Sequence, residues 1–332
     1  MVDEIIKIAR AELPVNEELV IQKHRMAGGS ETKRICVVTG IHGDELEGQY
    51  VAYELARRIE AGVNENPDVL NGIVDIYPAM NPFGIDSVTR GIPAFDLDMN
   101  RIFPGNMQGD MNEYLASEIV KDMKGADLCL DIHASNIFLT EVPQIRINEL
   151  HKETLVPIAA KSNVDFIWVH GASTVLESTF AHSMNSVGVP TLVVEMGVGM
   201  RITKEYGDQM VDGIFNLMVE LGIWSKAGTA GNETNADSIR KPVISDDSNG
   251  MDVYYLNAPV SGVFIKDMNH GELVSEGDHI GRIVNPLTGK LLSNIVAPAA
   301  GWLFTIREYP MVEEGSLMGR ILKQEVYDKC RS

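Results

Sequence analysis

Basic residues are scarce in this chain of 332 residues. Lysine and arginine total 28 against 47 aspartates and glutamates, which gives a formal net charge of -19 at pH 7. Nucleic acids and anionic membranes are bound by basic patches that neutralise phosphate, so we expect neither as a partner. A small anionic substrate is not excluded, because its binding site needs only a few local positive charges.

Cysteines and long apolar runs are also scarce. Cys36, Cys129 and Cys330 show no paired spacing, and the first two lie in apolar segments that suit buried small side chains. The N-terminal residues are acidic and lack a basic stretch followed by an apolar one, so we expect no signal peptide. No apolar stretch is long enough to span a bilayer. These absences together predict a soluble, cytoplasmic protein.

Strand and helix patterns alternate through the first two thirds of the chain, and 45% of all residues are hydrophobic, enough for a large core. β-branched apolar runs predict strands at 34–39, 72–77, 127–132, 164–169 and 190–195, and helical spacing predicts helices at 47–58, 112–123 and 208–221. Strand–helix–strand units build parallel sheets. We therefore predict an α/β fold with a mixed, largely parallel sheet flanked by helices. Residues 81–105 form a long irregular segment, which is typical of a functional loop.

The composition changes near residue 226. Residues 226–247 are polar and lack apolar periodicity, and short alternating segments punctuated by glycine follow from residue 253, which predicts a small all-β module. Residues 271–283 and 309–321 share one pattern of Val, acidic, Gly, polar, apolar, Gly, Arg and Ile, which favours a barrel-sandwich domain built from duplicated hairpins. The predicted division is a catalytic α/β domain at 1–226, a linker or excursion at 227–250 and a β-rich C-terminal domain at 251–332.

Candidate metal ligands stand where predicted strands end. His42 and Glu45 lie three positions apart on a short loop after one strand, His133 follows another, and Glu195 ends a third. The ends of parallel strands meet at one edge of a sheet. Imidazole and carboxylate groups bind zinc, and a catalytic zinc site has three protein ligands and one open position. Each residue alone has an ordinary structural explanation, but their shared position favours a metal site.

The loop at 81–105 adds Arg90, Asn100 and Arg101. An amide beside a guanidinium suits a substrate carboxylate, which accepts two parallel hydrogen bonds from arginine. The alternative is an ion pair of Arg101 with Asp96 or Asp98 that holds the loop in place, and the sequence favours neither reading.

In their order along the chain, these motifs resemble the succinylglutamate desuccinylase/aspartoacylase family of zinc carboxypeptidase-like hydrolases. The resemblance is carried by Gly40-Ile41-His42-Gly43-Asp44-Glu45, Asn81-Pro82-Phe83-Gly84, Arg90, Asp98-Met99-Asn100-Arg101-Ile102-Phe103-Pro104-Gly105, Asp131-Ile132-His133 and Glu195. The family's Asp-Leu-Asn-Arg appears here as Asp-Met-Asn-Arg, an apolar change of similar volume. The glycine-punctuated C-terminal part is similar to the C-terminal domain of the same family.

The resemblance implies a zinc-carboxypeptidase-like fold and a zinc-dependent deacylase that hydrolyses the linear amide bond of a small N-acylated amino acid or related carboxylate. It implies one Zn2+ per subunit, a small anionic N-acyl substrate, and a role for each matching residue. These roles are zinc ligand for His42, Glu45 and His133, general base and then acid for Glu195, polarisation of the scissile carbonyl for Arg90, and binding of a substrate carboxylate for Asn100 and Arg101.

Several alternatives stay open. The same zinc site would serve a carboxypeptidase acting on short peptides, and access to the cleft separates the two enzymes. A binding protein with a decayed site is disfavoured because no candidate ligand is missing, and a lipoyl-type carrier at Lys290 is disfavoured because that lysine lacks an acidic neighbour. The acyl group, the amine, a homo-oligomeric state and the part played by a C-terminal tyrosine (Tyr254, Tyr255 or Tyr309) are not determined. Arg146 either meets a second substrate carboxylate or is a surface charge, and the sequence favours the surface charge.

Overall fold

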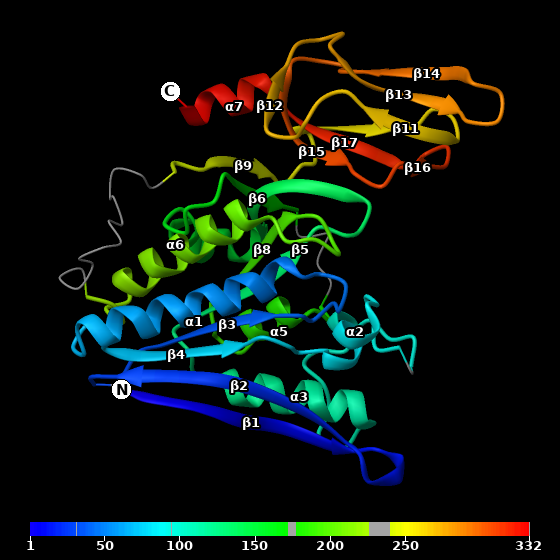
Figure 1. Ribbon diagram of the computed structural model, residues 1–332. Coiled ribbons are helices and arrows are strands. Elements are labelled where there is room, and N and C mark those ends of the chain that lie inside the picture. The colour runs from blue at the N-terminus through cyan, green and yellow to red at the C-terminus, as the bar shows by residue number, and fades with distance from the viewer. Residues whose placement is uncertain (31, 94, 172–176, 226–239, 332) are drawn as a thin grey trace.

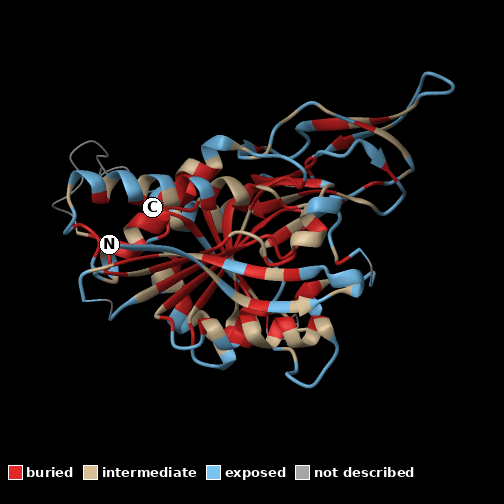
Figure 2. Ribbon diagram, turned by 60° about the horizontal axis from the view of Figure 1, so that its bottom comes forward, coloured by how far each residue is buried: buried red, intermediate tan, exposed pale blue. Residues whose placement is uncertain are grey.

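One large mixed sheet organises the computed structural model, which describes residues 1–30, 32–93, 95–171, 177–225 and 240–331 (Figure 1). Its strands follow the order β1-β2-β4-β3-β5-β8-β6-β15-β17-β10, and β7, β9 and β12 are attached to it at the side. The strands at its centre are parallel and comprise β3 (Arg34–Thr39), β4 (Gly72–Tyr77), β5 (Leu128–Ala134) and β8 (Thr191–Gly197). The predicted α/β fold with a largely parallel sheet is confirmed. Figure 2 shows that this centre is buried.

Helices cover both faces of the central strands. One face packs against apolar side chains of α1 (Glu47–Glu65), α4 (Lys152–Ala159) and α6 (Lys204–Glu220). The other face packs against α3 (Met111–Met123) and α5 (Phe180–Ser186). The shorter helices are α2 (Pro82–Ser87), α7 (Gln324–Arg331), η1 (Pro14–Asn16), η2 (Met99–Arg101) and η3 (Glu149–His151). No helix of the described residues is both long and apolar enough to cross a membrane.

Four strands were not predicted from the sequence: β1 (Val2–Glu12), β2 (Glu18–Gly28), β6 (Leu139–Asn148) and β9 (Val243–Asp247). The outer strand β1 contains three isoleucines but buries only Ala9, so its apolar residues do not mark a buried face. In β6 the buried residues include Glu141 and Gln144, and these polar side chains interrupt the apolar pattern that would indicate a buried strand. The strand β7, predicted at 164–169, spans Phe166–His170.

The prediction of a linker or excursion at 227–250 is wrong for residues 243–247, because they form β9, which pairs with β7 in parallel. Its buried positions include Ser245 and Asp247, and the Asp247 carboxylate accepts a hydrogen bond of 3.2 Å from Nε1 of Trp168. Because these buried positions are polar, the segment shows no apolar periodicity, and the sequence does not predict β9. Residues 226–239 of the proposed linker lie outside the described residues.

The C-terminal part is β-rich, as predicted. Its strands are β10 (Val253–Asn257), β11 (Gly262–Lys266), β12 (Glu272–Val274), β13 (His279–Asn285), β14 (Lys290–Val296), β15 (Gly301–Arg307), β16 (Met311–Val312) and β17 (Leu317–Lys323). The two similar sequence segments form β12–β13 and β16–β17, and each turns at a glycine with positive φ, Gly277 at 87° and Gly315 at 85°. A left-handed backbone favours glycine, which explains the repeated pattern. Because β15 pairs with β6, the large sheet continues into this part (Figure 1).

Candidate active site

The strand ends of the central sheet bring the predicted residues together. His42 and Glu45 lie between β3 and α1, His133 is in β5 and Glu195 is in β8. His133 and Glu195 are register partners on neighbouring parallel strands, so their side chains leave the sheet side by side. All seven predicted site residues line one cavity of about 320 Å³, namely His42, Glu45, Arg90, Asn100, Arg101, His133 and Glu195.

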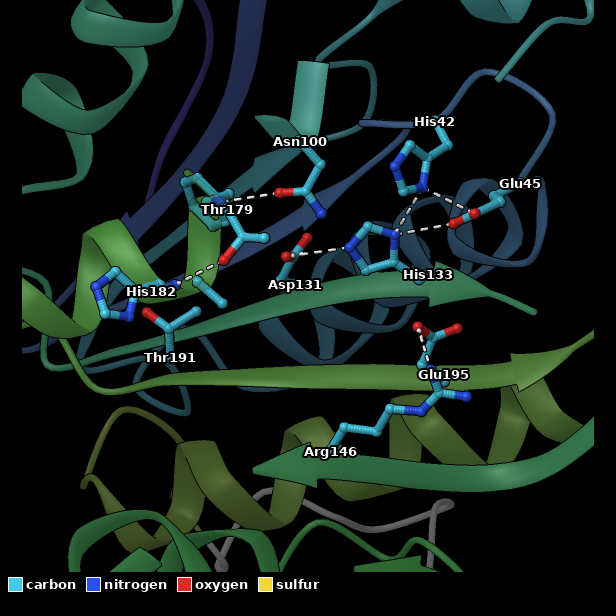
Figure 3. Close-up of polar contacts among 12 residues, drawn as sticks. His42, Glu45, Asn100, Asp131, His133, Arg146, Thr179, His182, Thr191 and Glu195 are labelled. Carbon is cyan, nitrogen blue, oxygen red and sulfur yellow. Dashed lines mark hydrogen bonds and ion pairs between the residues drawn. The ribbon is translucent and has the colours of Figure 1, made fainter. Parts of the chain in front are cut away.

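Three donor groups converge in this cavity (Figure 3). The Nδ1 atom of His42 lies 2.8 Å from Oε1 of Glu45, and Nδ1 of His133 lies 2.9 Å from Oε2 of the same carboxylate. The two Nδ1 atoms are 3.2 Å apart, and all three side chains are buried. Two imidazole nitrogens that face each other at this distance need a proton or a cation between them. Two nitrogens and a carboxylate are also a donor set that zinc accepts, so the residues fit a metal ion.

Each imidazole has a carboxylate on its other side. Nε2 of His133 is 3.1 Å from Oδ2 of Asp131, and Nε2 of His42 is 3.2 Å from Oδ1 of Asp98. A carboxylate that binds Nε2–H leaves Nδ1 free to coordinate, and such partners orient metal-binding histidines. Asp131 lies two residues before His133, so both side chains point to the same face of β5.

The electrostatic surroundings favour a positive charge among the three candidate metal ligands. Burial opposes protonation of His133, but the carboxylates of Asp131 and Glu45 raise its pKa well above the usual value. Burial likewise opposes ionisation of Glu45, but the charge of His133 and hydrogen bonds from both imidazoles lower its pKa to about 2. A negative, buried group of this kind stabilises a cation between the imidazoles.

Arg90 contacts two of the three candidate metal ligands. Its Nη2 atom is 2.9 Å from Nε2 of His42, and its Nη1 atom is 3.1 Å from Oε1 of Glu45. The contacts of His42 Nε2 with Arg90 and with Asp98 require opposite proton placements, because arginine only donates and the carboxylate only accepts. The Asp98 contact is the one that leaves Nδ1 of His42 unprotonated and facing the other donors. The guanidinium of Arg90 is 43% exposed and is therefore accessible from the cavity.

Asn100 and Arg101 line the same cavity. Asn100 is buried, and its Oδ1 atom accepts a hydrogen bond of 2.8 Å from the backbone N–H of Phe180, which leaves the side-chain N–H groups for another partner. Arg101 is exposed and donates to the backbone oxygen of Asn100 at 2.7 Å. Among the ion pairs of the described residues none joins Arg101 to Asp96 or Asp98, so the alternative of a loop-holding ion pair is not supported.

Glu195 is held by Arg146, whose Nη1 atom is 3.4 Å from Oε1. In Figure 3 the Glu195 carboxylate lies between that guanidinium and the group of His42, Glu45 and His133. Burial raises the pKa of Glu195, and the charges of Arg146 and His133 oppose this rise. A carboxylate with a raised pKa and partial exposure suits proton transfer.

The reading of Arg146 as a surface charge is wrong. Its side chain is only 28% exposed, lines the cavity and also binds Glu141, with Nη2 2.7 Å from Oε2. Arg320 of β17 binds the same carboxylate and lines the cavity too, so the C-terminal part supplies one wall. Sequence reasoning missed Glu141 and Arg320 because β6 was not recognised. The three candidate tyrosines, Tyr254, Tyr255 and Tyr309, do not line this cavity.

Comparisons with known proteins bear on the family and the fold of this chain. Residues 31–221 match the family model of the succinylglutamate desuccinylase/aspartoacylase catalytic domain. An N-alpha-acetyl-L-2,4-diaminobutyric acid deacetylase of Halomonas elongata is 30% identical over 105 residues, which cover 31% of this chain and only 29% of that relative.

Solved structures match nearly the whole chain. A succinylglutamate desuccinylase/aspartoacylase from Rhodobacter sphaeroides matches with a TM-score of 0.76 and 23% identity, covering 97% of this chain and 95% of the other. The product-bound ectoine utilization protein of Ruegeria pomeroyi matches with a TM-score of 0.77 and 18% identity, with the same coverage of 97% and 95%. At these identities the structural matches support the fold alone.

Proposed function

Because the chain belongs to the succinylglutamate desuccinylase/aspartoacylase family, a family of deacylases, we propose that it is a zinc-dependent amidohydrolase that removes the acyl group from a small N-acylated amino acid. The observation that carries this proposal is the single cavity lined by all seven residues of the predicted site. The convergent donors of His42, Glu45 and His133 would hold the metal. When bound there, zinc lowers the pKa of a coordinated water and polarises a carbonyl oxygen.

Glu195 and Arg90 have separate roles in the proposed hydrolysis. The water oxygen forms a bond to the carbonyl carbon, the carbon–nitrogen bond breaks, and a proton moves from the water to the departing nitrogen. Glu195 takes that proton and delivers it, which is the work of a general base and then acid. Its contact with Arg146 and its position beside His133 support this role. Arg90, with its exposed guanidinium, donates hydrogen bonds to the carbonyl oxygen as negative charge develops there.

Asn100 and Arg101 orient the substrate. The side-chain N–H groups of Asn100, which have no hydrogen-bond partner in the described part of the chain, and the guanidinium of Arg101 supply adjacent hydrogen-bond donors for the substrate carboxylate. Holding this carboxylate places the amide next to His42, Glu45 and His133, so that substrate binding also orients the reacting bond. The product pair is a free amino acid and a carboxylic acid.

A deacylase is favoured over a carboxypeptidase by the wall that the C-terminal part adds to the cavity. Its volume of about 320 Å³ suits a small ligand, and Arg320 of the C-terminal part forms one of its walls. A peptide substrate requires an open groove on the amino side of the cleaved bond. The relative from Halomonas elongata is named for deacetylation of an N-acetylated amino acid, which is the same kind of bond.

Product analysis by mass spectrometry tests this proposal. Zinc-loaded protein is incubated with N-acetyl, N-formyl and N-succinyl amino acids, and separately with blocked dipeptides. We expect a free amino acid from the N-acyl compounds and no cleavage of the dipeptides. Loss of the C-terminal residue from the dipeptides, without deacylation, would establish the carboxypeptidase instead.

A further inference from the structure

A second cavity, of about 330 Å³, adjoins the candidate active site. It shares four wall residues with the first cavity, which are Arg146, Thr179, Ala181 and Val193. From there it extends among residues of β6, β8, α4 and α5. Figure 3 shows Thr179, His182 and Thr191, which line this second cavity, on the Asn100 side of the site.

The shared wall is also where the substrate carboxylate would be held. Asn100 is fixed by the backbone N–H of Phe180, and Phe180 stands between Thr179 and Ala181 in the chain. In an N-acylated α-amino acid the side chain branches from the carbon that carries the carboxylate. A carboxylate held at Asn100 therefore places that side chain close to the shared wall, beyond which the second cavity lies.

Among the described residues, no carboxylate and no lysine lines this cavity. The one arginine among the described lining residues, Arg146, already binds Glu141 and Glu195. Burial lowers the pKa of His151, and burial together with the charges of Arg146 and Arg320 lowers the pKa of His170 to about 3. Both shifts favour the neutral imidazole. A charged group that is buried without a partner carries a large energetic penalty.

Neutral groups are accommodated well. Ile147, Leu155 and Val193 supply apolar contacts. The Nε2 atom of His170 is buried and has no hydrogen-bond partner among the described residues, so it can pair with a hydroxyl or an amide. The volume is at the lower end of the range of small-molecule pockets and suits one amino-acid side chain.

We infer that the second cavity receives the side chain of the substrate's amino acid and selects an uncharged one, aliphatic or aromatic, with or without a neutral hydrogen-bonding tip. This inference rests on the proposed deacylase function, and it names the substrate class of that site.

Wild-type kinetics with one acyl group and five side chains test the inference. After the acyl group is chosen from acetyl, formyl and succinyl, kcat/KM is measured for the N-acyl derivatives of glycine, L-leucine, L-phenylalanine, L-aspartate and L-2,4-diaminobutyrate. We expect leucine or phenylalanine to exceed both charged side chains by at least tenfold. Equal or higher values for aspartate or diaminobutyrate would overturn the inference, while turnover of the glycine compound would still support the proposed function. No turnover of any compound, glycine included, would overturn both.

A charge placed in the cavity gives a second, independent readout. His182 is partly exposed on α5 and lines the cavity, so His182→Lys adds a fixed cation there. The ratio of kcat/KM for the leucine compound to that for the aspartate compound should fall at least tenfold. His279→Lys is the matched control, because His279 lies on β13 and pairs with Asp267, outside both cavities. An unchanged ratio in a folded His182→Lys protein would overturn the inference, and if that variant does not fold, the wild-type series decides.

Discussion

Asp131 should set the zinc affinity of the site without itself being a ligand. Its carboxylate is 1% exposed and lies 3.1 Å from Nε2 of His133, on the side of the ring opposite the converging donors. The contact is an ion pair: neither Oδ1 of Asp131 nor Nε2 of His133 has a hydrogen-bond partner among the described residues. Asp131→Asn keeps the shape of the side chain and removes the charge that orients His133 and makes it more basic.

The magnitude follows from that geometry. Loss of a carboxylate behind a ligating histidine weakens metal affinity by roughly 10- to 100-fold, which corresponds to about 1.4 to 2.7 kcal/mol. The assay is competition for zinc against a chromophoric chelator at pH 7, with metal-free protein and circular dichroism to show that the variant is folded. Asp86→Asn, at an exposed position of α2, is the control and should bind zinc as the wild type does. A dissociation constant for Asp131→Asn within twofold of the wild-type value would refute the reasoning.

Two further predictions concern stability. Asp75→Ala removes a fully buried carboxylate that accepts two hydrogen bonds of 2.7 Å from Arg25 and lies 3.2 Å from Nζ of the buried Lys23. It should lower the free energy of unfolding in urea by about 3 kcal/mol, the low end for a broken buried pair, because Asp122 remains near the lysine and Arg25 is partly exposed. A loss under about 1 kcal/mol would contradict this. Hydrogen bonds from Arg57 and Arg58 lower the pKa of Glu54 from 4.5 to about 2, although burial acts in the opposite direction. Because the folded-state pKa is depressed, this stabilisation is present above pH 4.5 and is lost as the pH falls toward 2. The unfolding free energy of Glu54→Gln should therefore depend less on pH in that range than that of the wild type. An identical pH dependence of the two proteins would exclude the role of this carboxylate.

The sequence was sufficient where burial is apolar. Residues 34–39 and 72–77 were predicted as strands with the observed bounds, because each is a short segment dominated by β-branched apolar side chains, most of which are buried. The same logic predicted that the residues after these strands would meet at one edge. Since the topology of parallel strands fixes that edge, the convergence of His42, Glu45, His133 and Glu195 in one cavity could be predicted without coordinates.

The sequence was insufficient where polar groups are buried in pairs. Arg146 was read as a surface charge because its partner Glu141 belongs to a strand, β6, whose buried face is itself partly charged. The contribution of Arg320 depends on the pairing of β15 with β6, a long-range contact that no local pattern reports. The outer hairpin of β1 and β2 was missed for the opposite reason, since one of its strands is almost entirely exposed.

The most direct test of the central claim is the Glu195→Gln variant, measured for both zinc content and hydrolysis. The substitution keeps the size of the side chain next to His133 and removes the carboxylate that is proposed to move the proton. We predict one zinc per chain, as in the wild type, and a loss of turnover of an N-acyl amino acid by at least roughly 10²-fold. Glu205→Gln, at an exposed position in the first turn of α6, should keep both properties. Zinc-loaded Glu195→Gln protein that hydrolyses the substrate at the wild-type rate would contradict the account.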